Sequence, residues 1–332
     1  MIRVGLLGTG RIGSLHAESI ASHRESTLTA VSDINDETAN KLAAQYGAVV
    51  KSADEIISDT NIDAILIATS TDTHSDFIEK AAAAGKAILC EKPVDLSLIR
   101  AKECLDKVSA AKNPIMVGFN RRFDPNFAQL KKSLDNGEIG NRELLTITSF
   151  DPAPPPISYV KISGGLYRDM MIHDFDLSNF IMGELPISIS AVGHSLVDPA
   201  IGVAGDVDTA VVTMVYADGK IAVIKNSRRA AYGYDQRIEI LGSEGLLQAE
   251  NILENSVVKS NNDGVISAKP KYFFLERYIG AFKAEWDAFL KSIHNHKPVP
   301  VTLEDGVAAL AMAEAAAQSQ NTGKSIQLKE LL

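Results

Sequence analysis

The 332-residue sequence contains few cysteines, few aromatic residues and no long apolar segment. Its two cysteines, Cys90 and Cys104, are too few for a disulfide framework and form no C-x-x-C motif, which favours a reducing compartment. Aromatic residues make up 6% of the chain, so a lectin-like aromatic platform is not expected. A membrane span needs ~18 apolar residues, and the run 62–68 is already interrupted by Asp63. We therefore expect no membrane partner.

Basic charge is also scarce, because 33 basic residues stand against 42 acidic ones and the net charge is -9. Nucleic-acid-binding proteins usually carry a basic surface that neutralises phosphates. The densest basic spots here are the pairs Arg121-Arg122 and Arg228-Arg229, so no nucleic-acid partner is expected. The N-terminal segment has one basic residue before a glycine motif and lacks the features of a signal peptide, which favours the cytoplasm.

The remaining composition is that of a globular protein, with 45% hydrophobic and 23% charged residues. The length suits about two domains of ~150 residues each. Over the first 120 residues, short apolar runs alternate with helical stretches, and the runs are nearly continuous, as in strands buried on both faces. The pattern predicts a doubly wound parallel sheet in a domain covering 1–120, with strands at 2–7, 28–31, 64–68, 87–90 and 115–119, and helices at 14–22, 36–46, 74–84 and 97–111.

Beyond residue 120 the strand-like runs follow one another with tight turns between neighbours, which predicts a large, mostly antiparallel open sheet. The second domain, 121–332, is therefore α+β, with expected strands at 143–150, 187–197, 207–216, 219–226, 236–241 and 256–259, and helices at 174–182, 273–294 and 302–320. The last helix could pack back towards the first domain. A sheet with one uncovered face would need a partner, so we expect a homo-oligomer, a dimer or a homotetramer.

The segment Gly8-Thr9-Gly10-Arg11-Ile12-Gly13 matches the pattern G-x-G-x-x-G between a predicted strand and a predicted helix. The first Gly permits the tight turn, the second lets the backbone approach a pyrophosphate, and the third allows close helix–sheet packing. The helix then presents amide N–H groups and its positive dipole end to phosphates. The context predicts a dinucleotide site, whereas a glycine turn without a ligand is the alternative.

Two further segments are expected at this dinucleotide site. Asp33 follows Gly13 by 20 residues, and its carboxylate can accept hydrogen bonds from a ribose diol while repelling a 2′-phosphate, so NAD is favoured over NADP. The segment Thr69-Ser70-Thr71-Asp72-Thr73 leaves the predicted strand 64–68, and Thr69, Ser70 and Thr73 could supply hydroxyls to the dinucleotide. His74 could contact the cofactor or simply begin a helix.

The segment Glu91-Lys92-Pro93 follows the predicted strand 87–90. A lysine at the carboxyl end of a parallel strand points towards the ligand crevice of such folds. Proline fixes the chain after it, and the Lys92–Pro93 bond could be cis. From position alone, a surface lysine and a functional one are equally good interpretations of Lys92.

The second candidate site contains Asp169 and His173, which are four residues apart and would share one face of a helix. A carboxylate beside an imidazole raises its proton affinity and fixes its tautomer, as a general base requires. The pair could instead be half of a metal site, or a helix N-cap Asp beside an unrelated buried His. No H-E-x-x-H motif occurs and both cysteines lie in the other domain, so no metal is expected.

Taken together, the glycine motif, Glu91-Lys92-Pro93 and the Gly164-Gly165 pair ahead of Asp169 and His173 resemble the Gfo/Idh/MocA family of dehydrogenases. The resemblance covers nearly the whole chain. Within the family, the segments 118–125 (GFNRRFDP) and 171–176 (MIHDFD) are most similar to inositol 2-dehydrogenases. The resemblance implies an NAD-dependent oxidoreductase of inositol catabolism that oxidises a secondary hydroxyl of a cyclic polyol.

Roles for individual residues follow from this resemblance. It implies that His173 removes the hydroxyl proton, that Asp169 orients the imidazole or holds an adjacent hydroxyl, and that Lys92 hydrogen-bonds the reacting oxygen. It places Glu91 and Lys92 at the cofactor too. Candidates for further substrate contacts, besides Asp169 and His173, are Asn120, Arg121, Tyr159 and Tyr234.

Two alternative functions remain open on the sequence. The first is a hexose or sugar-acid dehydrogenase of the same family, because Arg121, Arg122 and Arg168 could bind an anionic substrate. The second is a non-catalytic, NAD-responsive regulatory protein, although a pure sensor needs no proton acceptor. A purely structural protein would leave the glycine motif and Asp33 unexplained.

Overall fold

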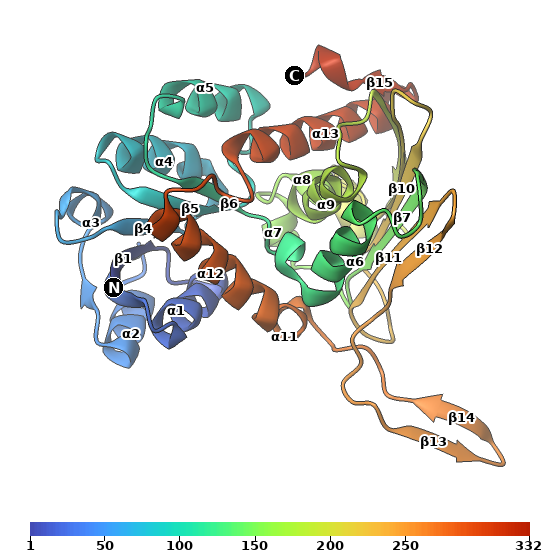
Figure 1. Cartoon of the computed structure of the whole chain (residues 1–332), viewed down its shortest axis with the longest axis horizontal. Helices are drawn as coiled ribbons and strands as arrows, with labels where there is room; N and C mark the ends of the chain where they lie inside the picture. Colours follow the sequence, from blue (N-terminus) through green and yellow to red (C-terminus); the bar gives the residue numbers. More distant parts are fainter. The chain divides into compact units, whose positions relative to one another are not determined.

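The computed structural model describes all residues from Met1 to Leu332 and divides them into two compact units. Unit 1 comprises Met1–Phe123 and Ala281–Leu310, and unit 2 comprises Asp124–Gly280 and Ala311–Leu332. Each unit has its own sheet and its own helices (Figure 1). No helix of the chain is both long and apolar enough to cross a membrane.

The sheet of unit 1 has six parallel strands in the order β3-β2-β1-β4-β5-β6, which confirms the predicted doubly wound parallel sheet and is the order of a Rossmann fold. Every residue of β4 and β5 is buried, as expected for strands covered on both faces. The order reverses between β1 and β4, and ligands of such folds bind at the carboxyl ends of the strands beside this point. The strands are β1 (Ile2–Leu7), β2 (Ser26–Ser32), β3 (Val49–Val50), β4 (Ala64–Ile67), β5 (Ala87–Glu91) and β6 (Ile115–Gly118).

Helices cover both faces of this sheet, with α4 and α5 on one side and α1, α2 and α12 on the other (Figure 1). The helical elements here are α1 (Arg11–Ser22), α2 (Asp36–Tyr46), α3 (Ala53–Ser58), η1 (Thr71–Thr73), α4 (His74–Ala83), α5 (Leu98–Val108), η2 (Asn120–Phe123), most of α12 (Ile279–Asn295) and the start of α13 (Leu303–Thr322).

The division of the chain differs from the one based on sequence. One boundary, at Phe123, lies close to residue 120, the predicted end of the first domain. Residues 281–310, however, belong to unit 1, whereas the sequence assigned them to the second domain. The reason is the packing of α12, whose buried Trp286 donates a hydrogen bond from Nε1 to Ser26 Oγ at 3.0 Å. Phe282, one turn earlier, packs edge-on against His16, with ring centroids 5.2 Å apart.

The sheet of unit 2 has seven strands in the order β12-β11-β7-β10-β9-β8-β15. Only the β7–β10 pair is parallel, so the predicted mostly antiparallel sheet is confirmed. The strands are β7 (Arg142–Phe150), β8 (Ser188–His194), β9 (Thr209–Val215), β10 (Ile221–Ser227), β11 (Asp235–Gly242), β12 (Gly245–Ala249) and β15 (Ile326–Gln327).

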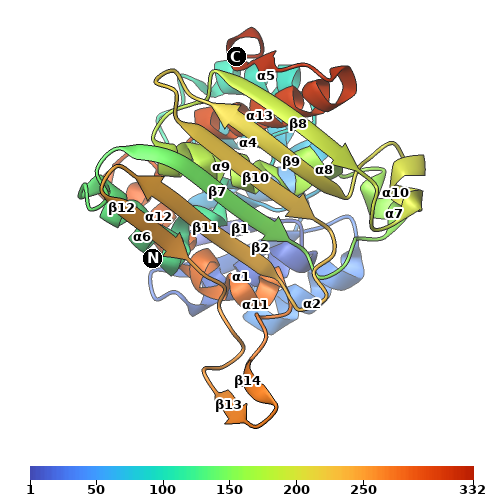
Figure 2. The ribbon, with the colours of Figure 1, turned by 90° about the vertical axis from the view of Figure 1, so that its right-hand side faces the viewer.

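Helices lie on one face of this sheet only, and Figure 2 looks onto the other face, which no helix covers. The hairpin formed by β13 (Val258–Asn261) and β14 (Gly264–Ser267) projects from unit 2, and all of its strand residues are exposed. The helical elements of unit 2 are α6 (Pro125–Asp135), α7 (Ile157–Val160), α8 (Gly165–Asp169), α9 (Ile172–Met182), α10 (Pro199–Val203), α11 (Phe274–Arg277), the end of α13 and η3 (Leu328–Glu330).

Candidate functional site

The three glycines of the glycine motif occupy distinct environments at the carboxyl end of β1. Gly8 has φ of +94°, and a Cβ there would collide with the backbone of Ala68. A Cβ on Gly13 would collide with the carbonyl of Gly8, so this glycine allows the close approach of α1 to the turn. A Cβ on Gly10 would meet nothing within 4 Å. The backbone at Gly10 therefore faces open space, as the approach of a pyrophosphate requires.

Helix α1 begins directly after this open position, with Arg11 and Ile12 in its first turn. Its N-cap residue is Gly10, which has no side chain to bond the first amides, and its first turn carries no acidic side chain. An anion at this end would interact with the positive end of the helix dipole. Gly10 and the first turn of α1 therefore fit a phosphate group of a dinucleotide.

Asp33 follows β2, and its carboxylate is oriented by backbone amides. Its Oδ2 accepts hydrogen bonds from Thr9 N at 2.6 Å and Thr9 Oγ1 at 2.9 Å, and its Oδ1 accepts one from Asn35 N at 2.9 Å. Burial acts to raise the pKa of Asp33, but the bonds from Asn35 and Thr9 outweigh it and lower the pKa. The group is thus an oriented anion beside the glycine motif, with acceptor capacity left for a ribose diol.

The predicted hydroxyl segment forms the turn between β4 and α4. Thr69 Oγ1 lies 2.7 Å from Thr73 Oγ1, and Thr73 Oγ1 donates to Ser70 O at 2.7 Å. His74 is the first residue of α4 and is 1% exposed. Its Nδ1 lies 2.8 Å from Pro93 O and its Nε2 lies 3.1 Å from Thr69 O. Both ring nitrogens therefore face backbone carbonyls, and a contact of His74 with the cofactor stays a prediction.

Glu91 is the last residue of β5, and the Lys92–Pro93 peptide bond after it is cis. Glu91 Oε1 lies 2.7 Å from Nε2 of His16, which is fully buried in α1. Lys92 is half-buried and follows β5 at the carboxyl edge of the sheet, the same edge as Gly10 and Asp33. His16 was not identified from the sequence, because it lies 75 residues from Glu91 and only the fold brings them together.

Asp169 and His173 do not lie on one helix, which corrects the expectation from their spacing. Helix α8 ends at Asp169, and α9 begins at Ile172. The amides of Met170 and Met171 both bond Leu166 O, and Asp174 N bonds Met171 O, so the regular helical pattern is broken between the two residues. Gly164 and Gly165, both with positive φ, form the turn that starts α8.

Asp169 lies in a polar cluster of unit 2 that includes one predicted residue and one that the sequence did not reveal. Tyr159 donates from its hydroxyl to Asp169 Oδ1 at 2.9 Å. Arg228, which is 2% exposed, donates from its guanidinium to Asp169 Oδ2 at 3.2 Å. Arg228 follows β10, where its position in a basic pair gave no sign of burial. The carboxylate is thus held from two elements, and a charge-assisted bond fixes one of its oxygens.

A buried network fixes the start of the helix that carries His173. Asp174 is fully buried; its Oδ1 accepts a bond from Ser149 of β7 at 2.6 Å and its Oδ2 one from Asn226 of β10 at 2.9 Å. Ser149 in turn lies 2.9 Å from the side-chain amide of Gln236 on β11. Three strands of the sheet therefore hold the first turn of α9, and they fix the backbone that carries His173.

The other predicted substrate residues are placed as follows. Asn120 and Arg121 lie in η2 of unit 1, directly after β6, and both are buried. Tyr234 precedes β11 in unit 2, is 4% exposed and packs edge-on against Tyr278 with ring centroids 6.0 Å apart. The ring of Tyr234 is therefore buried. Whether these three side chains touch substrate stays a prediction.

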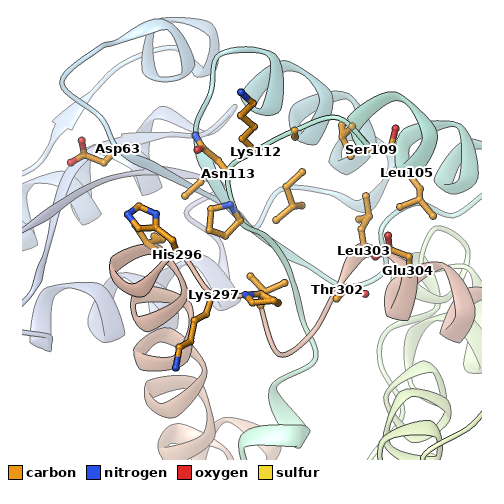
Figure 3. A pocket seen from close by; sticks show the side chains of 18 residues that line it. Asp63, Leu105, Ser109, Lys112, Asn113, His296, Lys297, Thr302, Leu303 and Glu304 are labelled. Carbon is orange, nitrogen blue, oxygen red and sulfur yellow. The ribbon is translucent and has the colours of Figure 1, made fainter.

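A separate cavity of about 510 Å³ opens in unit 1 at the amino ends of β5 and β6. Figure 3 shows His296 and Asp63 at one side of it, whereas the amino groups of Lys112 and Lys297 point away from its centre. None of the predicted site residues lines this cavity. It lies at the opposite sheet edge from the glycine motif and is not the candidate site.

Two family models match the chain. The model described as an oxidoreductase family with an NAD-binding Rossmann fold matches residues 2–119, and that of an oxidoreductase family C-terminal alpha/beta domain matches residues 131–328. Together they cover both predicted halves of the chain.

Several relatives are similar over nearly the full length. The inositol 2-dehydrogenase of Rhizobium meliloti (strain 1021) is 46% identical, covering 98% of this chain and 99% of the relative. The myo-inositol 2-dehydrogenase of Thermotoga maritima is 43% identical over 100% of both chains. The crystal structure of a scyllo-inositol dehydrogenase from Lactobacillus casei, with NAD(H) and scyllo-inositol bound, is 31% identical with a TM-score of 0.92 and covers 99% of each chain.

Proposed function

The chain belongs to the Gfo/Idh/MocA family of oxidoreductases, and from this premise we propose that it oxidises myo-inositol to 2-keto-myo-inositol. It is an NAD-dependent oxidoreductase that acts on CH–OH groups. The observation that carries the proposal is the cluster around Asp169, which is held by Tyr159 and Arg228 just ahead of the helix that carries His173.

NAD, when bound, supplies the acceptor for a hydride. The open backbone at Gly10 and the start of α1 would hold its pyrophosphate, and Asp33 would hold its adenosine ribose. Thr69, Ser70 and Thr73 would add hydroxyl contacts along the dinucleotide. These residues all lie at the carboxyl edge of the parallel sheet.

His173 acts as the general base in the proposed reaction. As the C–H bond of the reacting carbon breaks and its electron pair leaves as hydride, the hydroxyl proton passes to the imidazole, and the carbinol becomes a ketone. The buried network around Asp174 fixes the helix turn that carries this imidazole. Such fixed placement removes part of the entropic barrier to proton transfer.

Asp169 and Lys92 support this step. With Tyr159 and Arg228 bonded to it, the Asp169 carboxylate keeps a fixed orientation and can hold the imidazole or a neighbouring hydroxyl of the ring. The ammonium group of Lys92 would donate a hydrogen bond to the reacting oxygen and stabilise the charge that develops there.

A neutral polyol fits the chain better than a sugar acid does. Arg168 is already paired with Glu314, and Arg122 lies 3.2 Å from Asp305. Two of the three arginines that could bind an anionic substrate are therefore neutralised within their own units. We propose contacts of Asn120, Arg121, Tyr159 and Tyr234 with the hydroxyls of the polyol.

A substrate panel tests the proposed function. Purified protein with NAD should form NADH with myo-inositol at a kcat/KM at least tenfold above those with scyllo-inositol, aldohexoses and uronates. The comparison is made by NADH absorbance at saturating NAD. Preference for a uronate would select the sugar-acid alternative. Tight NAD binding with no oxidation of any polyol at any pH would select the regulatory alternative.

We also propose that the uncovered face of the unit 2 sheet packs against a second copy of the chain. One apolar row crosses five strands on this face, because the paired positions place its members side by side. The row consists of Leu246, Leu241, Leu144, Ile221 and Val215. A contiguous apolar row on a sheet surface is typical of an interface. Two copies joined this way form a dimer, and a second contact would give a tetramer.

The central member of this row is the best position for a test. Leu144 is 38% exposed and pairs with both Ile221 and Leu241. We expect Leu144→Lys to convert the assembly to monomers, because burying two lysines against apolar partners is costly. Light scattering after size exclusion measures this, with the exposed hairpin variant Val265→Lys as control. An unchanged mass for Leu144→Lys would place the interface elsewhere.

We further propose a reducing, cytoplasmic setting for the protein. Cys90 and Cys104 are both buried free thiols. Burial raises the pKa of Cys104 to about 11, so this thiol is a poor nucleophile and an inert part of the core. Cell fractionation tests this setting.

A further inference from the structure

We propose that His16 and His74 are positioning residues that fix Lys92 from both sides and connect it to the two cofactor loops. The inference rests on the proposed function insofar as Lys92 is assigned to the reaction. Each histidine belongs to a helix that starts at a cofactor loop: His16 to α1, whose first turn contains the end of the glycine motif, and His74 to α4, which follows the turn at 69–73.

The first contact reaches Lys92 through Glu91. His16 Nε2 lies 2.7 Å from Glu91 Oε1, and the backbone amide of Lys92 donates to Glu91 Oε2 at 3.3 Å. The carboxylate thus bridges the imidazole and the Lys92 backbone. Glu91 is 8% exposed and packs against Gly118 of β6, where a Cβ would lie 3.2 Å from both its Cα and its Cδ. The carboxylate therefore has little room to rotate away from these partners.

The second contact reaches Lys92 through Pro93. His74 Nδ1 lies 2.8 Å from Pro93 O, and the next residue of α4, Ser75, donates from Oγ to Val94 O at 3.2 Å. Burial lowers the pKa of His74, although the carbonyls of Pro93 and Thr69 and the charge of Glu91 oppose this. The neutral ring has one N–H, and the shorter contact, to Pro93 O, takes it. The start of α4 therefore holds the chain just after Lys92.

Each of these imidazoles makes a polar contact that an apolar side chain could not make. Both are at least 99% buried, and polar atoms at such positions are costly unless they are hydrogen-bonded. Their partners flank Lys92 on either side, and their helices begin at the loops that would hold the dinucleotide. Ordering of those loops by NAD is thus transmitted through two short rigid contacts to the position of the ammonium group.

His16 is tested with two substitutions of similar size. Gln keeps an N–H donor near the position of Nε2, whereas Met keeps the length and removes the donor. We expect His16→Met to lower kcat about 10- to 100-fold with KM for polyol changed less than about threefold, and His16→Gln to restore most of kcat, because misplacement of a catalytic group by about 1 Å costs such factors. His23→Met is the control, since His23 caps the C-terminus of the same helix and its ring contacts Asp287 at 3.5 Å and the amide of Glu25 at 3.2 Å, neither of which is a site residue.

His74 is tested in the same way. Asn places an N–H near the position of Nδ1 and can still donate to Pro93 O, whereas Leu cannot. We expect His74→Leu to lower kcat about 10- to 100-fold, because the carbonyl of Pro93 loses its hydrogen-bond donor and the chain after Lys92 is no longer fixed. We expect His74→Asn to retain kcat within about fivefold of the native chain.

A second readout does not depend on turnover. The rate of trace acetylation of the Lys92 amine is measured by mass spectrometry, with and without NAD. We expect NAD to change this rate in the native chain, the change to be lost in His16→Met, and the change to return in His16→Gln. Equal loss of kcat and of melting temperature in the Met and Gln variants, or the same response of the acetylation rate to NAD in all three proteins, overturns the proposal. If the protein oxidises no polyol at all, the proposed function fails. The labelling result still tests whether the histidines position Lys92, so the two failures can be told apart.

Discussion

Replacing His173 by Ala is expected to lower kcat for myo-inositol about 10²- to 10⁴-fold, the range that a general base contributes. The affinity for NAD should change less than about threefold, because the residue lies in unit 2 and the cofactor residues lie in unit 1. The pH dependence of kcat should also lose the limb that reports protonation of the base. Steady-state kinetics and calorimetric NAD titration measure these effects.

The matched control is His294→Ala, since His294 is a partly exposed histidine on α12 that faces Glu25 at 3.6 Å. It should retain native turnover. If His173→Ala keeps more than about a tenth of native kcat, the proton goes elsewhere and the base assignment is wrong. Far-UV circular dichroism shows whether a loss of activity in His173→Ala comes from unfolding. We expect α9 to remain helical, because Asp174 also holds it.

Replacing Asp33 by Ser is expected to lower the ratio of kcat/KM for NAD to that for NADP about 10²-fold. A fixed carboxylate near a 2′-phosphate costs several kcal/mol, and each 1.4 kcal/mol is about a factor of ten. The hydrogen bonds that lower the pKa of Asp33 keep it ionised throughout the neutral range, so the native preference for NAD should not change between pH 6 and pH 9.

Asp36→Ser provides the comparison, because Asp36 is an exposed carboxylate three residues later, in the first turn of α2. It tests whether any loss of negative charge nearby has the same effect. A cofactor preference that is unchanged in Asp33→Ser, or lost equally in Asp36→Ser, contradicts the assigned role of Asp33. NADH and NADPH formation are compared under the same conditions.

The cofactor half of the site could be predicted because its signals are local. Gly8, Gly10 and Gly13 lie within six residues; the backbone requires glycine at Gly8 and Gly13, whereas at Gly10 the missing side chain leaves open space. Asp33 comes at the end of an apolar run that is recognisable as a buried strand. The parallel sheet followed from such runs, although β3 was missed because Val49 and Val50 are both exposed at the sheet edge.

The second half of the site depends on contacts between distant residues. Arg228 meets Asp169 across 59 residues, and His16 meets Glu91 across 75, so no spacing rule reveals either pair. The helical spacing of Asp169 and His173 was misleading for a physical reason. The amides at Met170 and Met171 return to Leu166, which ends one helix before the next begins.

One missed element did have a sequence signal. Helix α6 begins at Pro125 after Asp124, whose side chain accepts hydrogen bonds from the amides of Asn126 and Phe127. An Asp N-cap followed by Pro is a standard helix start. The parallel pairing of β7 with β10 had no such signal in the sequence. The relative direction of two strands depends on the path of the long connection between them.

In the proposed reaction, hydride leaves one carbinol carbon of myo-inositol for NAD while the chain removes the proton. It is tested most directly by incubating the protein with NAD and myo-inositol that carries deuterium on carbon 2. We expect one deuterium in the nicotinamide ring of every NADH formed, measured by mass spectrometry, together with 2-keto-myo-inositol in equal amount. NADH without deuterium, or no NADH from this substrate, would contradict it.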